Sequence, residues 1–201
     1  MAFINLKEKI IQAKIVYYGP GRCGKTTNLE YIFSQCRGQV QSEMVSVKTD
    51  GDRTLFFDFF PFDMGKINEY DVKIQLYTVP GQVKYNSTRR LVLKGVDGLV
   101  FVADSASDRR ASNVNSLENL QENLALYGRD ICSIPLVMQY NKRDLAQQGT
   151  EVLELETLEE DLNRRLKAPF FEASAVEGLN IVPTLKKIVS STMAALEEEL
   201  R

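Results

Sequence analysis

The chain has 201 residues, of which 44% are hydrophobic and 26% charged, and its formal net charge is −2. This is ordinary globular composition, and the near-neutral charge argues against a nucleic-acid binder held by phosphate charge. The chain has no histidine and three cysteines (Cys23, Cys36 and Cys132), which excludes Ser-His-Asp triads, Cys-His dyads, histidine metal sites and a disulfide framework.

The N-terminal quarter predicts a strand, a helix and a long loop. A β-prone run at residues 15–18 stops at a glycine, and residues 2–6 are a candidate for an extra N-terminal strand. Apolar residues then recur at helical spacing from Gly24 until near Gly38. Residues 39–53 are polar and aperiodic, so we expect a loop there that is long enough to carry function.

The middle of the chain predicts four strands and a helix. Residues 54–60 and 72–78 are expected to be strands, the second because apolar and polar residues alternate. Residues 99–103 and 136–138 are nearly continuous apolar runs, which are typical of parallel strands covered on both faces. Between these runs, residues 114–127 carry an apolar stripe at helical spacing.

The C-terminal part predicts two more helices and a last strand. Thr157 and Glu160 form a capping box before one apolar helix face. Residues 170–173 are expected to be a short strand, and residues 181–196 a final helix. Strands and helices alternate without an obvious linker, so we expect a single α/β domain over residues 1–201.

A glycine-rich segment lies where ligands bind in parallel sheets, at the carboxyl end of a strand. The segment from Gly19 to Thr26 fits G-x-x-x-x-G-K-[ST] between a predicted strand and a predicted helix. Glycines let backbone amides turn toward phosphate oxygens, and the helix N-terminus adds partial positive charge. Lys25 would neutralise the β- and γ-phosphates, and the Thr26 hydroxyl would ligate Mg²⁺. The other residues expected to bind the nucleotide here are Gly19, Gly21, Arg22, Cys23, Gly24 and Thr27.

Two further polar clusters follow predicted strands. The Asp144 carboxylate can accept from both N1–H and the 2-amino group of guanine, whereas adenine would leave it unpaired. Asn141 would hold the surrounding loops and the base edge, and the stem of Lys142 would cover the ring. At the end of the last strand, Ser174 and Ala175 offer a backbone amide for guanine O6. The alternative for the cluster from Asn141 to Asp144 is a solvated charged loop.

These clusters, in this order, resemble the Ras-like small GTPase superfamily over nearly the whole chain. A fourth cluster, Thr78-Val79-Pro80-Gly81-Gln82, has threonine where most Ras-like proteins have aspartate, and in this it is similar to the bacterial MglA-type polarity GTPases. The resemblance implies a three-layer P-loop NTPase fold with a mostly parallel sheet, one antiparallel strand and helices on both faces. It also implies Mg²⁺-dependent hydrolysis of GTP to GDP in a switch that controls cell polarity and gliding motility.

The resemblance also assigns catalytic residues. Gln82 would orient the attacking water, and Gly81 would donate its amide to the γ-phosphate. Thr54 would be the second protein ligand of Mg²⁺, beside Thr26, and Arg53 would serve as an arginine finger from within the chain. Thr78 carries no charge, which weakens the expected metal site, and Asp58 is the candidate substitute because it shares strand parity with Thr54. Asp104 is expected to be a local helix cap.

The implied partners are a roadblock-fold activating protein of the MglB type, an exchange factor, and downstream motility and polarity effectors. An apolar patch beside the expected switch loop could dock the activator. The patch would be formed by Phe56, Phe57, Phe59, Phe60 and Phe62, and it would bind the activator together with Met64 and the basic residues Lys84, Arg89 and Arg90. The alternative is that helices cover these phenylalanines. We find no signal peptide, myristoylation glycine or prenylation cysteine. We therefore expect a cytoplasmic protein, monomeric alone and recruited to cell poles through partners.

Two rival functions remain. A P-loop nucleotide or nucleoside kinase would need a second substrate pocket, and it has no use for the Asn141–Asp144 cluster. A guanine-nucleotide-binding scaffold with little hydrolysis is favoured by Thr78, because a weakened metal site impairs the chemistry. Gln82 and Arg53 argue against that scaffold, since both have little purpose without hydrolysis.

Overall fold

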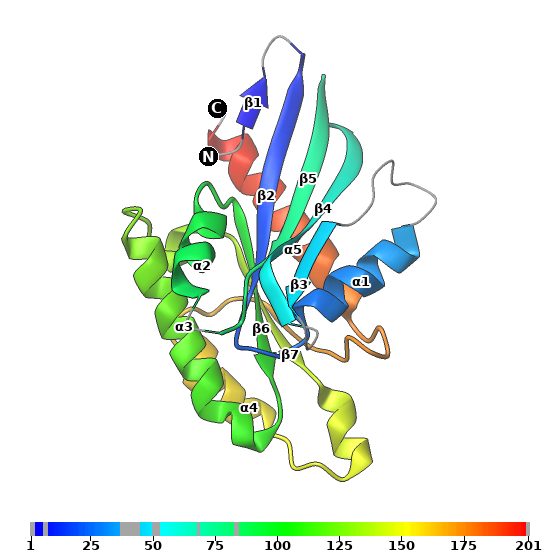
Figure 1. Cartoon of the computed structure of the whole chain (residues 1–201). Coiled ribbons are helices and arrows are strands. Elements are labelled where there is room, and N and C mark those ends of the chain that lie inside the picture. Colours follow the sequence, from blue (N-terminus) through cyan, green and yellow to red (C-terminus); the bar gives the residue numbers. More distant parts are fainter. Residues whose placement is uncertain are drawn as a thin grey trace.

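The structure is a computed structural model that describes residues 3–5, 8–36, 45–49, 53–67, 69–82 and 85–199, with the backbone alone at 3–5, 36, 45–49 and 53–67. Its centre is a mixed sheet in the order β3-β4-β5-β2-β6-β7-β8, with β1 paired to β2 (Figure 1). The strands are β1 (Phe3–Asn5), β2 (Ile10–Tyr18), β3 (Val45–Thr49), β4 (Arg53–Ile67), β5 (Tyr70–Thr78), β6 (Gly98–Asp104), β7 (Leu136–Asn141) and β8 (Phe170–Glu172).

Five strands of the sheet are parallel to one another: β5, β2, β6, β7 and β8. β4 joins β5 antiparallel, β3 joins β4 antiparallel, and β1 joins β2 antiparallel. The expectation of one antiparallel strand is therefore wrong. The sequence analysis did not predict β3, which lies inside residues 39–53, the segment expected to be a loop. The segment does carry a strand signal, because Val45 and Val47 alternate with Ser46 and Lys48, and treating residues 39–53 as aperiodic overlooked it.

Helices cover both faces of the sheet and produce two separate cores (Figure 1). One core packs α1 (Lys25–Cys36) and α5 (Ile181–Glu199) against side chains such as Ile15 and Val100. The other packs α2 (Asn86–Leu93), α3 (Arg110–Ala125) and α4 (Leu155–Leu158) against alternate residues of the same strands, including Val16 and Phe101. The predicted three-layer α/β arrangement follows from this alternation along the strands, because neighbouring side chains point to opposite faces. Among the described residues no helix combines the length and apolar character of a membrane span.

The predicted capping box at Thr157 is wrong. α4 begins at Leu155, after Glu154, and continues as a π-helical segment (Glu159–Asn163), so Thr157 lies within the helix. The final helix does begin at Ile181, and Pro183 lies in its first turn, where a missing amide proton costs no hydrogen bond.

The parallel register brings the carboxyl ends of the central strands to one edge. Tyr17 of β2 pairs with Thr78 of β5, and Tyr18 pairs with Phe101 of β6. Asp104 of β6 pairs with Asn141 of β7. Segments distant in the sequence therefore leave the sheet side by side, and the loops that follow these strands can build a common site.

Candidate nucleotide-binding site

Two positions in the loop between β2 and α1 have no room for a side chain. Gly19 has φ +144°, and a Cβ built there would lie 2.1 Å from the carbonyl oxygen of Val102. Gly24 has φ +98°, and its Cβ would lie 2.2 Å from the amide nitrogen of Asn141. Arg22 adopts a left-handed φ of +64° without being glycine. The loop is thus wrapped closely against the ends of β6 and β7.

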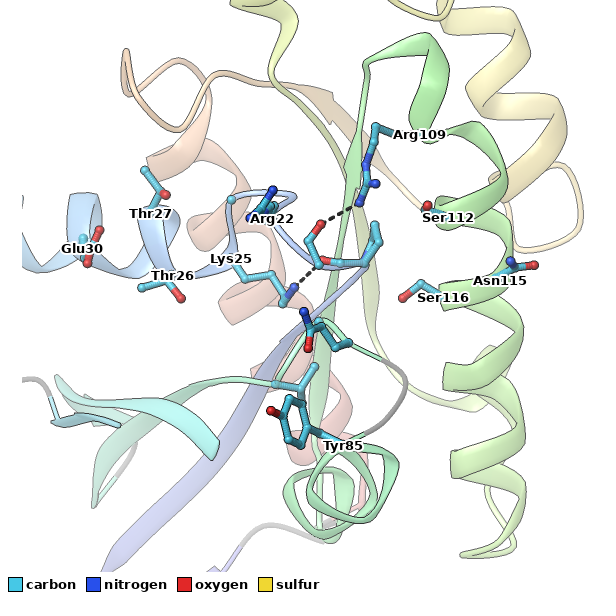
Figure 2. A pocket seen from close by; sticks show the side chains of 16 residues that line it. Arg22, Lys25, Thr26, Thr27, Glu30, Tyr85, Arg109, Ser112, Asn115 and Ser116 are labelled. Carbon is cyan, nitrogen blue, oxygen red and sulfur yellow. Dashed lines mark hydrogen bonds between the residues drawn. The ribbon is translucent and has the colours of Figure 1, made fainter. Parts of the chain in front are cut away.

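A cavity of about 610 Å³ opens above this loop (Figure 2). The loop and the first turn of α1 form one wall, including Lys25, Thr26 and Thr27. Gly81 and Gln82, after β5, line it as well. The opposite wall comes from the start of α3 and contains Arg109, Ser112, Asn115 and Ser116. Most of the predicted phosphate-binding and water-orienting residues therefore meet around one space.

The Lys25 side chain is tied to the loop. Its ammonium donates to the Pro20 carbonyl oxygen at 2.6 Å (dashed line in Figure 2). It also donates to the Gly19 carbonyl oxygen at 3.1 Å and lies 3.5 Å from Cys23 Sγ. Only 6% of Lys25 is exposed. A buried ammonium held by neutral carbonyls is an attractive partner for an anion, because its charge is not neutralised by these contacts. The N-terminus of α1 adds its partial positive charge at the same place.

Asp144, in the turn after β7, is the other chemically unusual group. Its residue is 7% exposed, and Oδ2 accepts from Gln148 Nε2 at 3.3 Å. Oδ1 is buried and accepts no hydrogen bond from the described part of the chain. An unsatisfied carboxylate oxygen is costly to bury, and a ligand that brings a donor edge would satisfy it. Guanine supplies such an edge with N1–H and the 2-amino group, whereas adenine does not. Asp144 does not itself line the cavity of about 610 Å³, and neither do the other residues predicted to bind the base.

Asn141 joins three loops. Its Nδ2 donates to the Cys23 carbonyl at 2.7 Å, and its Oδ1 accepts from the Ala175 amide at 2.9 Å. These two hydrogen bonds hold the loops after β2, β7 and β8 together, as expected for Asn141. The Ala175 amide, which we expect to reach guanine O6, donates to Asn141 Oδ1 in this structure. Ser174 is buried beside it, and its hydroxyl accepts from the Glu177 amide at 3.3 Å.

Lys142 and Asp104 are linked by an ion pair that the sequence analysis missed. Lys142 has a left-handed φ of +69°, and its Nζ lies 2.6 Å from Asp104 Oδ2. Asp104 Oδ1 accepts the Ala106 amide at 3.2 Å, just before the 3₁₀ turn Ser107–Arg109. The carboxylate thus supports the local turn with one oxygen and holds Lys142 with the other. The helix cap predicted at Asp104 is wrong, because the N-cap positions of the 3₁₀ turn and of α3 are Ala106 and Arg109.

The expected catalytic residues are only partly described. Gln82 is half-buried and lines the cavity, and Thr78 is fully buried at the end of β5. Arg53, Thr54 and Asp58 lie on β4, whose side chains are outside the described residues. The β3–β4 register shifts between the pairs that contain Thr54 and Asp58, so simple alternation does not place them on one face. Among the described residues no cluster of three carboxylate or thiol side chains could hold a metal.

The predicted docking role of Arg89 is wrong. Arg89 is fully buried in α2, where Nη1 donates to Asn119 Oδ1 at 2.7 Å and Nη2 to Ser116 Oγ at 3.0 Å. Its guanidinium lies 4.4 Å from the ring centre of Tyr18, and burial lowers the pKa of Arg89. A basic residue in a short amphipathic helix is usually solvent-exposed, but here α3 supplies polar acceptors. Lys84 and the side chains of the Phe56–Phe62 cluster and Met64 lie outside the described residues, whereas Arg90 is exposed.

Arg109 was also missed. It ends the 3₁₀ turn Ser107–Arg109 between β6 and α3, and its Nη2 donates to the Gly21 carbonyl at 2.8 Å (Figure 2). The position of Arg109 after a predicted strand end was the only signal in the sequence. A polar residue at such a position is a candidate for the site, but it carries no motif.

The comparisons with known proteins agree with this arrangement. The sequence model of the Ras family matches residues 14–194. The mutual gliding-motility protein MglA of Myxococcus xanthus is 47% identical over 198 residues, which cover 98% of this chain and 99% of that protein.

Proposed function

The chain belongs to the Ras family of small GTPases, and we propose that it is a molecular switch that hydrolyses GTP to GDP and phosphate. One observation carries the choice of nucleotide. Asp144 presents a buried, unpartnered carboxylate oxygen, while Lys25 and the N-terminus of α1 form a cationic end at the neighbouring loop. A ligand with a donor edge at one end and a polyphosphate at the other satisfies both.

Binding divides between two groups of residues. The carboxylate of Asp144 accepts hydrogen bonds from the guanine edge. The Ala175 amide, which also contacts Asn141 Oδ1, donates to guanine O6. Asn141 keeps these loops together, and Lys142 covers the ring. At the other end, Lys25 and the amides from Gly21 to Thr27 bind the phosphates.

Hydrolysis needs a positioned water and stabilisation of charge on the phosphate oxygens. Gln82 orients the water, Arg53 stabilises the charge as a finger from within the chain, and Gly81 senses the γ-phosphate. Mg²⁺, held by the hydroxyls of Thr26 and Thr54, supplies further neutralisation of the phosphate oxygens when bound. The cavity supports this assignment because Thr26 and Gln82 both line it. Turnover is slow without an activating partner.

The cellular role follows from the relative and the resemblance. We propose that residues 1–201 form one Ras-like domain that controls bacterial cell polarity and gliding motility. Its partners are an MglB-type activating protein of roadblock fold at the switch regions, an exchange factor and motility effectors. Of the basic residues expected to dock the activator, Arg90 is exposed and suited to it. The protein acts in the cytoplasm and is recruited to cell poles by these partners.

A guanine-nucleotide-binding scaffold with little hydrolysis is the second candidate. The observation in its favour is Thr78, which is fully buried and brings no carboxylate to the expected metal site. Single-turnover phosphate release with and without the activating protein separates the two. No release in either case supports the scaffold.

The test of the main proposal is nucleotide selectivity. We expect GTP to displace a bound fluorescent GDP on the order of ten-thousandfold more effectively than ATP, because adenine would leave the buried Asp144 carboxylate unpaired. In Asp144→Asn an amide donor replaces one acceptor, so guanine should lose its advantage and xanthine, with a carbonyl at C2, should gain. Equal capture of GTP and ATP by the parent protein would overturn the proposal.

A further inference from the structure

Arg109 contacts both the phosphate loop and a buried carboxylate. Its Nη2 donates to the carbonyl oxygen of Gly21 at 2.8 Å, and its Nε lies 3.7 Å from Asp104 Oδ2. The side chain is 31% exposed and lines the cavity. The guanidinium is therefore held at the wall of the site and still faces the space where phosphates would lie (Figure 2).

The hydrogen bond from Arg109 orients one peptide unit of the loop. The Gly21 carbonyl and the Arg22 amide belong to the same trans peptide, so they point in opposite directions. Fixing the carbonyl therefore fixes where the amide points. Arg22 has a left-handed φ of +64°, which an L-residue with a side chain adopts at a cost. An external contact helps to hold a backbone in this conformation.

Asp104 holds Arg109 and at the same time contacts the guanine motif. The carboxylate is 1% exposed, and Oδ2 accepts from Lys142 Nζ at 2.6 Å on the other side. A buried carboxylate needs such cationic partners, because loss of either leaves charge poorly compensated. Lys142 follows β7, Asp104 ends β6 and Arg109 precedes α3. One carboxylate thus joins the base side of the site to the phosphate loop.

From this geometry we propose that Arg109 is a positioning residue for the diphosphate of a bound guanine nucleotide, held in place by Asp104. Arg109 keeps the Gly21–Arg22 peptide turned so that the Arg22 amide is available to a phosphate oxygen. It also adds positive charge at the cavity wall. This inference rests on the proposed function and extends it to a residue outside the sequence motifs.

The test compares two adjacent arginines. In Arg109→Ala we expect release of fluorescent GDP to accelerate about tenfold, as one charged hydrogen bond is lost. Arg110→Ala is the matched control, because Arg110 is exposed and pairs with Asp161 away from the loop. It should change the rate less than about twofold. The ³¹P resonance of the GDP β-phosphate should shift only in the Arg109 variant, which a merely structural role would not produce.

Two more variants keep the test decisive. Arg109→Lys keeps the positive charge but has a single donor nitrogen in place of the guanidinium fork, so it cannot serve Gly21 and Asp104 together and its GDP release should be intermediate. Asp104→Asn should also speed release, and combining it with Arg109→Ala should give less than the product of the single effects. If Arg109→Ala proves unstable, the lysine variant alone decides.

The outcomes separate this inference from the proposed function. Parental release rates and an unmoved β-phosphate resonance in the Arg109 variants overturn the inference, while the parent protein still prefers guanine nucleotides. A parent protein that shows no such preference overturns the proposed function, and the positioning role fails with it.

Discussion

The backbone of Gly81 lies directly against that of Gly21. A Cβ built on Gly81 would lie 2.3 Å from Gly21 Cα and 2.5 Å from its nitrogen. The reverse is not true, since a Cβ on Gly21 would meet the Gly81 carbonyl oxygen at 3.7 Å and Gln82 Cγ at 3.9 Å. The loop after β5 therefore reaches the phosphate loop only because Gly81 has no side chain.

Gly81→Ala should consequently displace the loop that carries Gln82. The added methyl cannot be accommodated without backbone movement, because the atoms it meets belong to the main chain. We expect single-turnover hydrolysis of GTP to slow by about tenfold or more, as misplacement of a water-orienting residue costs transition-state stabilisation. GTP affinity should fall much less. A normal hydrolysis rate would contradict the placement of Gly81 against the phosphate loop.

Two substitutions of Gly21, the other residue of this contact, differ in the size of the side chain that they add. In Gly21→Ala the methyl makes ordinary contacts, so hydrolysis should fall little. Gly21→Val extends two further carbons toward Gln82 and should keep GTP binding while slowing hydrolysis by about tenfold. The measurement is phosphate release from preloaded protein, with retained GTP counted in parallel. Equal rates for the alanine and valine variants would speak against steric displacement.

Arg89 is predicted to be a stability residue. Arg89→Ala removes the guanidinium donors to Asn119 Oδ1 and Ser116 Oγ and creates a space over the Tyr18 ring, although Asn119 Oδ1 still accepts from the Tyr18 hydroxyl. We expect the free energy of unfolding to fall by about 3 kcal/mol. Arg90→Ala, at an exposed position of the same helix, should change it by less than about 0.5 kcal/mol. Urea denaturation of the GDP-loaded proteins measures both, and equal losses would refute the buried role.

Asp97 gives a pH-dependent prediction. Its Oδ2 accepts the Lys14 amide at 2.8 Å, and burial raises the pKa of Asp97 above its ordinary value of 3.8. As pH rises from 3.8 through the raised pKa, folded molecules hold a proton that unfolded ones have lost. The Asp97 contribution to stability therefore falls with rising pH. Asp97→Asn keeps an acceptor without the charge, so its stability relative to the parent should increase over this range. Denaturation at several pH values measures this, and a constant difference would contradict it.

Most of the correct predictions came from patterns among residues that are close together in the sequence. The run from Gly19 to Thr26 combines a strand end, glycines and a helix start, so its local chemistry already indicated a phosphate loop. The apolar runs in β6 and β7 identified buried parallel strands, because such strands must be apolar on both faces. Parallel order then placed Asn141 and Asp144 at the same sheet edge.

Contacts between distant residues could not be predicted in this way. Whether Arg89 faces solvent or the Asn119 amide depends on how α2 packs on α3. The local sequence around Arg89 is compatible with either orientation, so it could not decide between them. Arg109 reaches Gly21 across 88 positions. The strand Val45–Thr49 is different, because the alternation of Val45 and Val47 with Ser46 and Lys48 was a local signal that the prediction of a loop overlooked. The sequence determined the chemistry and order of the site, because motifs and apolar periods are local. The tertiary structure decided which polar groups are buried together, because hydrogen bonds between distant residues leave no periodic pattern.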